Sequence, residues 1–309
     1  MTSNPALLEV ETRALSQGVD GGGTAQDAPK TESDWLLFCL RFVFDTLCEL
    51  RRIRYSDFAG EVSIKSDGSP VSTIEQRVEL LLRRRLSEFD PTASVVGEEH
   101  GGEINRSGIS LAIDPVDGTW SFANRAETFA TTLALYREGI AEQAFVANPA
   151  TGEIAYTARR GRARLLQIGL AGEPSRGYDL PLPPASTPGL LVNLHPCRQM
   201  GPVMAALVGN WGAGKVRFVK ATGGSPVWSM LDAAKGVCTY VNLWPAAPTE
   251  PFDLAAGLLI VRAAGGDVID LNGNAVSPIE HSGVFIAGTD RAYLRELATI
   301  IRAAAAIDG

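Results

Sequence analysis

The chain has 309 residues, of which 45% are hydrophobic and 20% are charged, and such a chain can bury a large core. Its formal net charge of −7 argues against a nucleic-acid-binding protein, which needs a basic surface. Its four cysteines show no CxxC spacing and no disulfide-dense pattern, so we expect free thiols in a reducing, cytoplasmic environment.

The N-terminal stretch contains three consecutive glycines and no apolar period, which predicts a mobile tail over residues 1–33. It contains acidic residues and no apolar core, so it is not a secretory signal. From Asp34 to about residue 50, apolar side chains recur at helical spacing along one face, which predicts a helix. This helix carries charged residues and is too short to cross a bilayer, so we expect no membrane association.

The next stretch predicts elements that end in acidic residues. Residues 65–70 contain Asp-Gly-Ser-Pro and predict a loop, and residues 71–75 open a second helix. Residues 93–97 predict a short strand that delivers Glu98 and Glu99 at its end. A strand over residues 109–113 is expected to end at Asp114, because the following proline cannot donate to a ladder.

The remaining chain predicts two halves. Residues 129–166 contain β-like runs separated by turn sequences, which indicates an antiparallel meander. The proline-rich stretch 174–188 suggests an N-terminal half over residues 34–185 and a C-terminal half over residues 186–309. In the second half, strands and helices alternate, which indicates a mixed sheet covered on its faces. We expect strands at 190–194 and 215–219, helices at 202–208, 226–235, 253–264 and 291–305, and a hairpin over 267–275.

The most informative stretch joins the strand predicted at 109–113 to a short helix predicted at 119–124. Asp114 and Asp117 lie three residues apart on a turn, and Gly118 supplies backbone freedom before Thr119. Free N–H groups at the start of the helix would form an anion site beside the two carboxylates. Such an arrangement suits a divalent metal between the acids and a phosphate.

Four motifs together resemble those of the inositol monophosphatase family of magnesium-dependent phosphomonoesterases. They are Asp114-Pro115-Val116-Asp117-Gly118-Thr119-Trp120-Ser121-Phe122, Val96-Gly97-Glu98-Glu99-His100 upstream of it, and Gly224-Ser225 and Phe252-Asp253-Leu254-Ala255-Ala256-Gly257 downstream. They occur in the family's order, and the resemblance extends from about Asp34 to the C-terminus. It implies an α/β (α+β) fold, the layered αβαβα sandwich of the sugar-phosphatase type, and a homodimer.

The resemblance also implies a metal site. Its ligands would be Glu98, Asp114, Asp117, Asp253 and the backbone carbonyl of Val116. Oxygen ligands without His or Cys favour Mg²⁺ or Mn²⁺, and two or three ions and inhibition by lithium are expected from the family. Simpler interpretations exist, since Glu98 could belong to a solvated pair at a strand end and Asp253 could be a helix N-cap.

The catalytic residues implied by the resemblance are Thr119 and Glu75. In relatives, a threonine and an acidic residue at the start of the second helix activate a metal-bound water, and Glu75 stands where the family usually has aspartate. The alternative for Glu75 is a capping box with Ser72. The amides of Gly118 and Thr119 would hold the phosphate, beside Gly224 and Ser225. Lys65 matches a mobile lysine of the family, and a solvated loop lysine is the alternative.

The function implied is hydrolysis of a small-molecule phosphate monoester by in-line attack of a metal-activated water. Inositol-cleaving members carry an acidic residue seven positions before that of Asp253, where this chain has Ala246, and Pro226 replaces a usually small residue. Substrates resembling inositol phosphate, histidinol phosphate or a sugar phosphate are therefore all open, as are a 3′-phosphonucleotide and fructose bisphosphate. A catalytically silent, metal-binding interaction protein is the alternative of another class.

Overall fold

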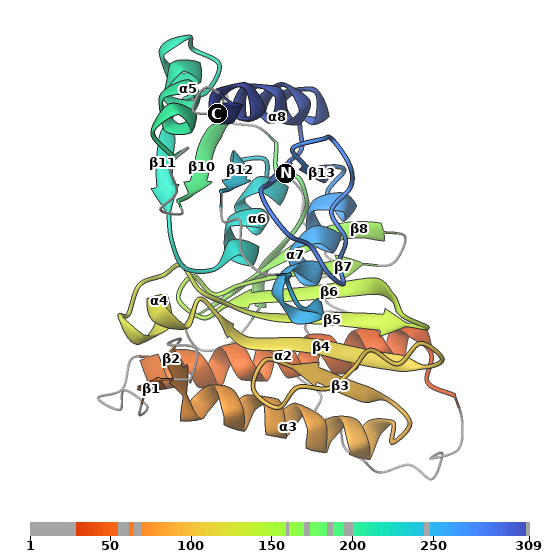
Figure 1. Ribbon diagram of the computed structural model, residues 1–309. Coiled ribbons are helices and arrows are strands. Elements are labelled where there is room, and N and C mark those ends of the chain that lie inside the picture. Colours follow the sequence, from red (N-terminus) through yellow and green to blue (C-terminus); the bar gives the residue numbers. More distant parts are fainter. Residues whose placement is uncertain are drawn as a thin grey trace.

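The computed structural model describes residues 29–54, 62–64, 70–158, 161–169, 174–183, 188–194, 200–243 and 248–306. Its elements stack as alternating helical and sheet layers (Figure 1). Most of the predicted tail, together with Lys65 and Ala246, lies outside the described residues. In the described ranges, no helix is both long and apolar enough to span a membrane.

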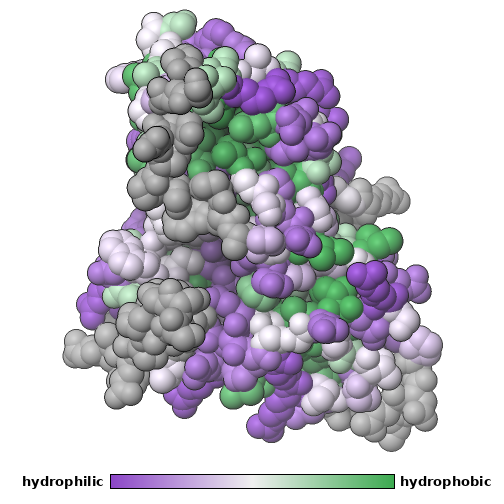
Figure 2. All heavy atoms as spheres, viewed as in Figure 1, coloured by the Kyte–Doolittle hydropathy of each residue, from purple (hydrophilic) through white to green (hydrophobic). Residues whose placement is uncertain are grey.

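The first layer consists of α2 (Glu32–Arg54) and α3 (Thr73–Phe89), which pack on β3 to β7 of the first sheet. The helix α2 begins at Glu32 instead of Asp34, because Thr31 and Asp34 exchange hydrogen bonds that cap its N-terminus. Trp35 packs edge-on against Phe89, with ring centroids 5.0 Å apart, and so joins the two helices. The outer face of α3 carries hydrophilic side chains (Figure 2).

The second layer is a seven-stranded sheet with the order β3-β4-β5-β6-β7-β8-β9. The pair β3–β4 is parallel and the other pairs are antiparallel, so the predicted meander is present. The strands are β3 (Ser94–Gly97), β4 (Ile109–Asp117), β5 (Ala130–Arg137), β6 (Ile140–Asn148), β7 (Glu153–Ala158), β8 (Arg162–Ile168) and β9 (Pro174–Asp179). The first part of the proline-rich stretch is therefore a strand. A separate antiparallel pair is formed by β1 (Val62–Ile64) and β2 (Pro70–Ser72).

The prediction that β4 ends at Asp114 is wrong. The strand continues to Asp117, and its register against β5 shifts between these two residues. Two residues of β4 face one of β5 there, so Pro115, which has no N–H, lies in a bulge where no ladder bond is lost. The hydroxyl of Thr131 donates to the carbonyl of Pro115 at 2.8 Å and fixes the bulge.

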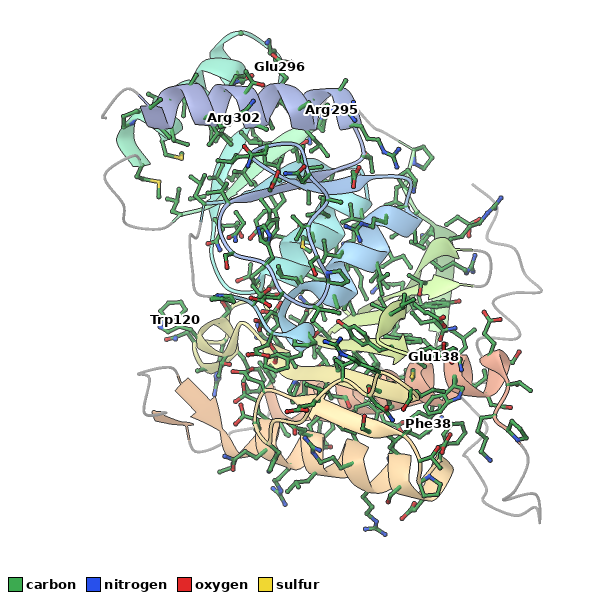
Figure 3. All side chains as sticks on the ribbon, turned by 45° about the vertical axis from the view of Figure 1, so that its right-hand side comes forward. Phe38, Trp120, Glu138, Arg295, Glu296 and Arg302 are labelled. Carbon is green, nitrogen blue, oxygen red and sulfur yellow. The ribbon has the colours of Figure 1, made fainter. Side chains whose placement is uncertain are left out.

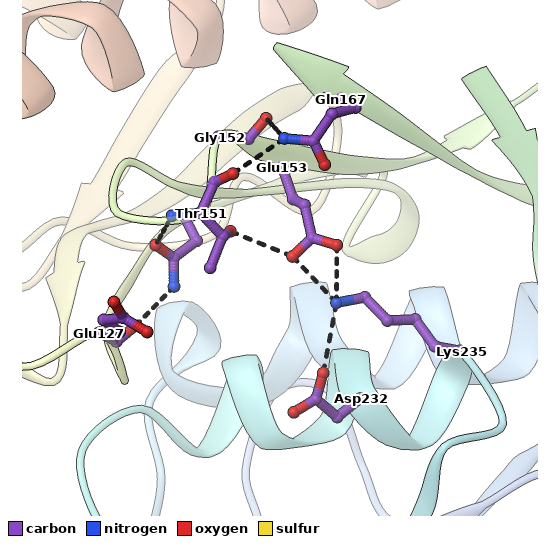
Figure 4. Close-up of polar contacts among 8 residues, drawn as sticks. Glu127, Thr151, Gly152, Glu153, Gln167, Asp232 and Lys235 are labelled. Carbon is purple, nitrogen blue, oxygen red and sulfur yellow. Dashed lines mark hydrogen bonds and ion pairs between the residues drawn. The ribbon is translucent and has the colours of Figure 1, made fainter. Parts of the chain in front are cut away.

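The third layer consists of α6 (Pro226–Ala234) and α7 (Pro251–Ala263), which lie between the two sheets (Figure 1). Their apolar side chains form a continuous core with residues of both sheets, including Val146, Met230, Leu258 and Phe285. An ion-pair network also crosses this layer (Figure 4). The ammonium group of Lys235, just after α6, lies 3.0 Å from the carboxylate of Glu153 on β7.

The last two layers are a five-stranded sheet and the helices α5 (Met200–Gly212) and α8 (Arg291–Ala305). The strand order is β11-β10-β12-β14-β13, and β10 is parallel to both of its neighbours. The strands are β10 (Gly189–Asn193), β11 (Val219–Thr222), β12 (Cys238–Asn242), β13 (Asp267–Asp270) and β14 (Phe285–Gly288). The complete arrangement is the predicted αβαβα sandwich.

Two predictions in this half are wrong. The strand expected at 215–219 begins only at Val219, because the amide of Lys215 donates to the carbonyl of Asn210 and closes the end of α5. The hairpin expected at 267–275 forms its turn, but its second arm makes a single bridge, between Ile269 and Ala275. The hydrogen-bonded partner of β13 is β14.

Candidate active site

The bulge of β4 places two carboxylates at the start of a turn. Asp114 and Asp117 are buried, with 6% and 8% of their surface exposed. Gly118 follows with a φ of 92° and leads into α4 (Thr119–Ala123), and only glycine adopts this φ without strain. A Cβ atom at Gly118 would also lie 2.8 Å from the amide nitrogen of Ser225. The turn therefore packs directly against the loop before α6.

The first turn of α3 brings Glu75 to Thr119. Glu75 is 1% exposed, and its Oε1 accepts a hydrogen bond from the Thr119 hydroxyl at 2.7 Å. The carbonyl oxygen of Val116 is the more distant acceptor, at 3.2 Å from the same hydroxyl. Glu75 is also the third residue of α3, the position that a capping box requires. Its carboxylate nevertheless contacts the turn after β4.

Glu98 and Asp253 reach the same region from β3 and α7. Glu98 follows the last residue of β3, and its amide donates to the carbonyl of Ile113 at 3.4 Å. Asp253 is the third residue of α7, and its Oδ2 accepts the amide of Glu250 at 2.6 Å. The N-cap is Glu250, so the interpretation of Asp253 as the N-cap is wrong. Asp253 is instead the third helical residue of a capping box, in which its side chain accepts the amide of Glu250.

Ser225 connects α6 to the carboxylates. Its hydroxyl accepts the amide of Trp228 at 2.8 Å and caps α6, and it donates to Asp117 Oδ2. The amide of Val227 donates to the same oxygen at 3.2 Å. Gly224 has a φ of 87°, and a side chain there would overlap Thr128. Gly224 and Ser225 were both predicted to contact the substrate, and Ser225 donates a hydrogen bond to Asp117.

The carboxylates concentrate negative charge. Burial raises the pKa of Asp114 well above its ordinary value, and the charges of Glu98, Asp117, Glu75 and Asp253 add to this effect. Burial raises the pKa of Asp117 to about 7, against the lowering effect of its hydrogen bonds from Ser225 and Val227. Burial likewise raises the pKa of Asp253 to about 6. A bound cation would offset this repulsion.

The donor set suits a hard divalent cation, because it consists of carboxylate oxygens and a carbonyl. Within the described ranges, no three Asp, Glu, His or Cys side chains are close enough together to form a preassembled metal site. The hydrogen bonds named above engage one oxygen each of Asp117 and Asp253, and Asp114 Oδ1 accepts the amide of Val116 at 2.8 Å. The carboxylates are thus held by their own neighbours around a shared region.

Tyr136, which no sequence motif singles out, positions α7. The hydroxyl of Tyr136, on β5, is buried and donates to the carbonyl of Pro278 at 2.8 Å, and the carbonyl of Pro251 lies at 3.2 Å. Tyr136 so fixes the start of the helix that carries Asp253. An alternating strand pattern shows only which face such a tyrosine is on, so the sequence offered no signal for this contact.

Figure 3 shows Trp120 projecting from α4 at the edge of the molecule, where it is 67% exposed.

The αβαβα layers are the layered sandwich of the sugar-phosphatase type, and the buried carboxylates lie beside its β4–α4 turn. The model of the inositol monophosphatase family matches residues 46–306. The chain therefore belongs to the inositol monophosphatase family, as predicted, and it is a phosphatase that acts on phosphate monoesters.

Individual relatives agree with this assignment. The chain is similar to an inositol-1-monophosphatase of Rhizobium meliloti (strain 1021), with 30% identity over 237 residues that cover 74% of this chain and 82% of the relative. It is also similar to a histidinol-phosphatase of Mycobacterium tuberculosis, with 26% identity over 242 residues that cover 75% of this chain and 85% of the relative. Among solved structures, an IMPase of Thermotoga maritima shares the fold, with a TM-score of 0.70, 21% identity and coverage of 89% and 100% of the two chains.

Proposed function

We propose that this phosphatase hydrolyses a small phosphorylated metabolite with the help of Mg²⁺ or Mn²⁺ ions. The ions would be held by Glu98, Asp114, Asp117, Asp253 and the carbonyl of Val116. When bound, they would lower the pKa of a water molecule and offset the charge of the phosphate. The observation that carries the proposal is the 2.7 Å hydrogen bond from Thr119 to the buried Glu75, next to two buried aspartates.

This hydrogen bond gives Thr119 a defined role. A hydroxyl has one proton, and Thr119 donates it to Glu75, so the lone pairs of its oxygen are available to accept a proton from water. Thr119 would therefore orient the attacking water. Glu75 would receive the proton that passes from the water through the Thr119 hydroxyl. Glutamate in place of the family's usual aspartate reaches Thr119 in this chain, which supports a working site.

The turn after β4 would bind the phosphate. The amides of Gly118 and Thr119 lie where the strand turns into α4, next to the carboxylates. Ser225 and the amide of Val227 would hold Asp117 in place while it binds a cation, because they already donate to its Oδ2. The exposed Gly224, on the loop that packs against this turn, would lie on the side of the leaving group.

A phosphate-release assay tests the proposal. The purified chain would be incubated with Mg²⁺ and a panel containing inositol 1-phosphate, histidinol phosphate, fructose 1,6-bisphosphate and a 3′-phosphonucleotide. We expect phosphate release from at least one compound, and its loss in Asp114→Asn. A folded protein that binds Mg²⁺ but releases no phosphate from any compound would favour the silent interaction protein instead.

A further inference from the structure

Glu79 is a second buried acidic residue on α3, one helical turn after Glu75. Its side chain is fully buried, with 0% exposed. Burial of a carboxylate destabilises the fold unless hydrogen-bond donors surround the group, so the contacts of Glu79 indicate its role.

Both oxygens of Glu79 are engaged. Its Oε2 accepts the backbone amides of Glu99 at 2.9 Å and of His100 at 3.3 Å. Its Oε1 accepts Nε and Nη2 of Arg83 at 3.0 Å and 2.7 Å, and it lies 3.3 Å from Nδ1 of His100. The carboxylate therefore holds a segment of backbone on one side and an arginine on the other.

The backbone segment is the turn that follows β3. The amide of Gly97 donates to the carbonyl of Gly101 at 3.1 Å, and the amide of Gly101 donates back at 2.9 Å, which closes the turn over residues 98–100. Arg83 donates to the carbonyl of Gly101 at 2.6 Å and to that of Val95 at 3.2 Å. Two side chains of α3 therefore hold this turn in place: Glu79 accepts hydrogen bonds from the amides of the turn, and Arg83 donates hydrogen bonds to carbonyls at its ends.

The contact continues on the other side of Glu98. A Cβ atom on Gly97 would overlap the carboxyl group of Glu79, so only glycine allows this approach. Glu79 therefore packs against the residue before Glu98 and bonds to the amide of the residue after it. The backbone of Glu98 is fixed at both ends, and this fixes the direction in which its side chain leaves the chain.

We propose that Glu79 is a positioning residue, which aims Glu98 and thereby sets the affinity of the site for divalent cations. It contacts the turn and not the cation, because its oxygens are occupied by backbone amides and Arg83. The inference rests on the proposed function, in which Glu98 is a metal ligand. Partners that orient metal ligands typically change metal affinity or activity by about 10- to 100-fold when they are removed.

The test is the binding of Mn²⁺, followed by the electron paramagnetic resonance signal of the free ion. Glu79→Gln keeps the size of the side chain but replaces one acceptor oxygen with a donor, so it cannot satisfy both the amides and Arg83. We expect its Mn²⁺ affinity to fall by about 10-fold or more. The matched control is Glu88→Gln on the same helix, whose side chain is 64% exposed and pairs with Arg84, and its Mn²⁺ affinity should equal that of the wild type.

Phosphate release in the same variants separates positioning from general damage. The concentration of Mg²⁺ needed for half-maximal activity should rise in Glu79→Gln, while kcat at saturating Mg²⁺ stays near the wild-type value. Partial unfolding would instead reduce the number of active sites without changing this concentration. If Glu79→Gln does not fold, Glu79→Asp keeps the charge beside Arg83 but shortens the reach to the amides, and its Mn²⁺ affinity should also fall.

A folded Glu79→Gln or Glu79→Asp protein with wild-type Mn²⁺ affinity would overturn the positioning role. Glu98→Gln, measured alongside, shows which proposal fails. If Glu98→Gln binds Mn²⁺ weakly and the Glu79 variants bind normally, only the role of Glu79 is wrong. If Glu98→Gln also binds normally, the proposed ligand set is wrong, and the inference falls with it.

Discussion

Replacement of Glu75 by glutamine isolates the proton-accepting role of this residue from its role in the helix. Glutamine has nearly the same size and still offers one oxygen to the Thr119 hydroxyl, but it cannot take up a proton at neutral pH. We expect kcat to fall by about 10²-fold or more, with little change in KM, as for the loss of a general base. A 10²-fold loss corresponds to about 2.7 kcal/mol of transition-state stabilisation.

The stability of the metal-free variant should change far less. The bond from Thr119 to a carboxylate is stronger than one to an amide, by about 1 kcal/mol, so its replacement destabilises the fold. The charge of Glu75 also adds to the repulsion that raises the pKa of Asp114, and its removal relieves that repulsion. The two effects oppose each other, so the free energy of unfolding should stay within about 1 kcal/mol of the wild type.

The assay combines steady-state phosphate release at saturating Mg²⁺ with thermal unfolding in chelator. Glu88→Gln, exposed on the same helix, is the matched control and should leave both quantities unchanged. A Glu75→Gln protein with kcat within twofold of the wild type would refute the reasoning, because glutamine satisfies the capping position equally well. Glu75→Asp restores the family's usual residue, and slower turnover would show that the backbone fits the longer side chain.

Three further predictions concern the carboxylates: two substitutions and one pH dependence. Asp114→Asn should abolish turnover while circular dichroism and thermal unfolding show an intact fold, and a wild-type rate would exclude this residue as a metal ligand. Asp253→Asn should lose most activity but change the free energy of unfolding by only about 1 kcal/mol or less, because the asparagine oxygen can still accept the amide of Glu250; a loss confined to stability would reduce Asp253 to a capping residue. The folded-state pKa of Asp117 is raised from 3.8 to about 7, so the metal-free protein binds more protons folded than unfolded in this range. The contribution of Asp117 to the stability of the metal-free protein should therefore be greatest at low pH and be lost as the pH rises through about 7. Urea titrations at pH 5.5 and 8 should show Mg²⁺ stabilising the protein more at pH 8. An equal effect of Mg²⁺ at both pH values would contradict this linkage.

Local patterns predicted the regular elements well. The helix α8 (Arg291–Ala305) has the predicted bounds because its apolar period and its flanking residues agree. The strands β12 and β14 were not predicted, because short buried strands have no alternation that distinguishes them from other apolar runs. The path of β4 past Pro115 was also missed, since a proline argues against a strand unless a bulge accommodates it.

The candidate site shows the same division. Asp114, Asp117 and Thr119 could be identified from the sequence because they lie close together in a single motif. The supporting contacts join distant segments, as in the hydrogen bond between Ser225 and Asp117, which are 108 residues apart, and no local pattern predicts such a pair. Glu79 has the appearance of an ordinary charged residue on an amphipathic helix, and only its burial distinguishes it from the solvated Glu88.

The dependence of phosphate release on divalent metal tests the central claim most directly. The protein would be stripped with chelator, desalted, and assayed with p-nitrophenyl phosphate before and after addition of Mg²⁺, with Asp114→Asn in parallel. Weak to moderate binding by an all-oxygen site predicts that the stripped wild type is inactive, that Mg²⁺ restores its activity, and that the variant stays inactive under both conditions. Full activity of the stripped protein, or of the variant, would contradict the account.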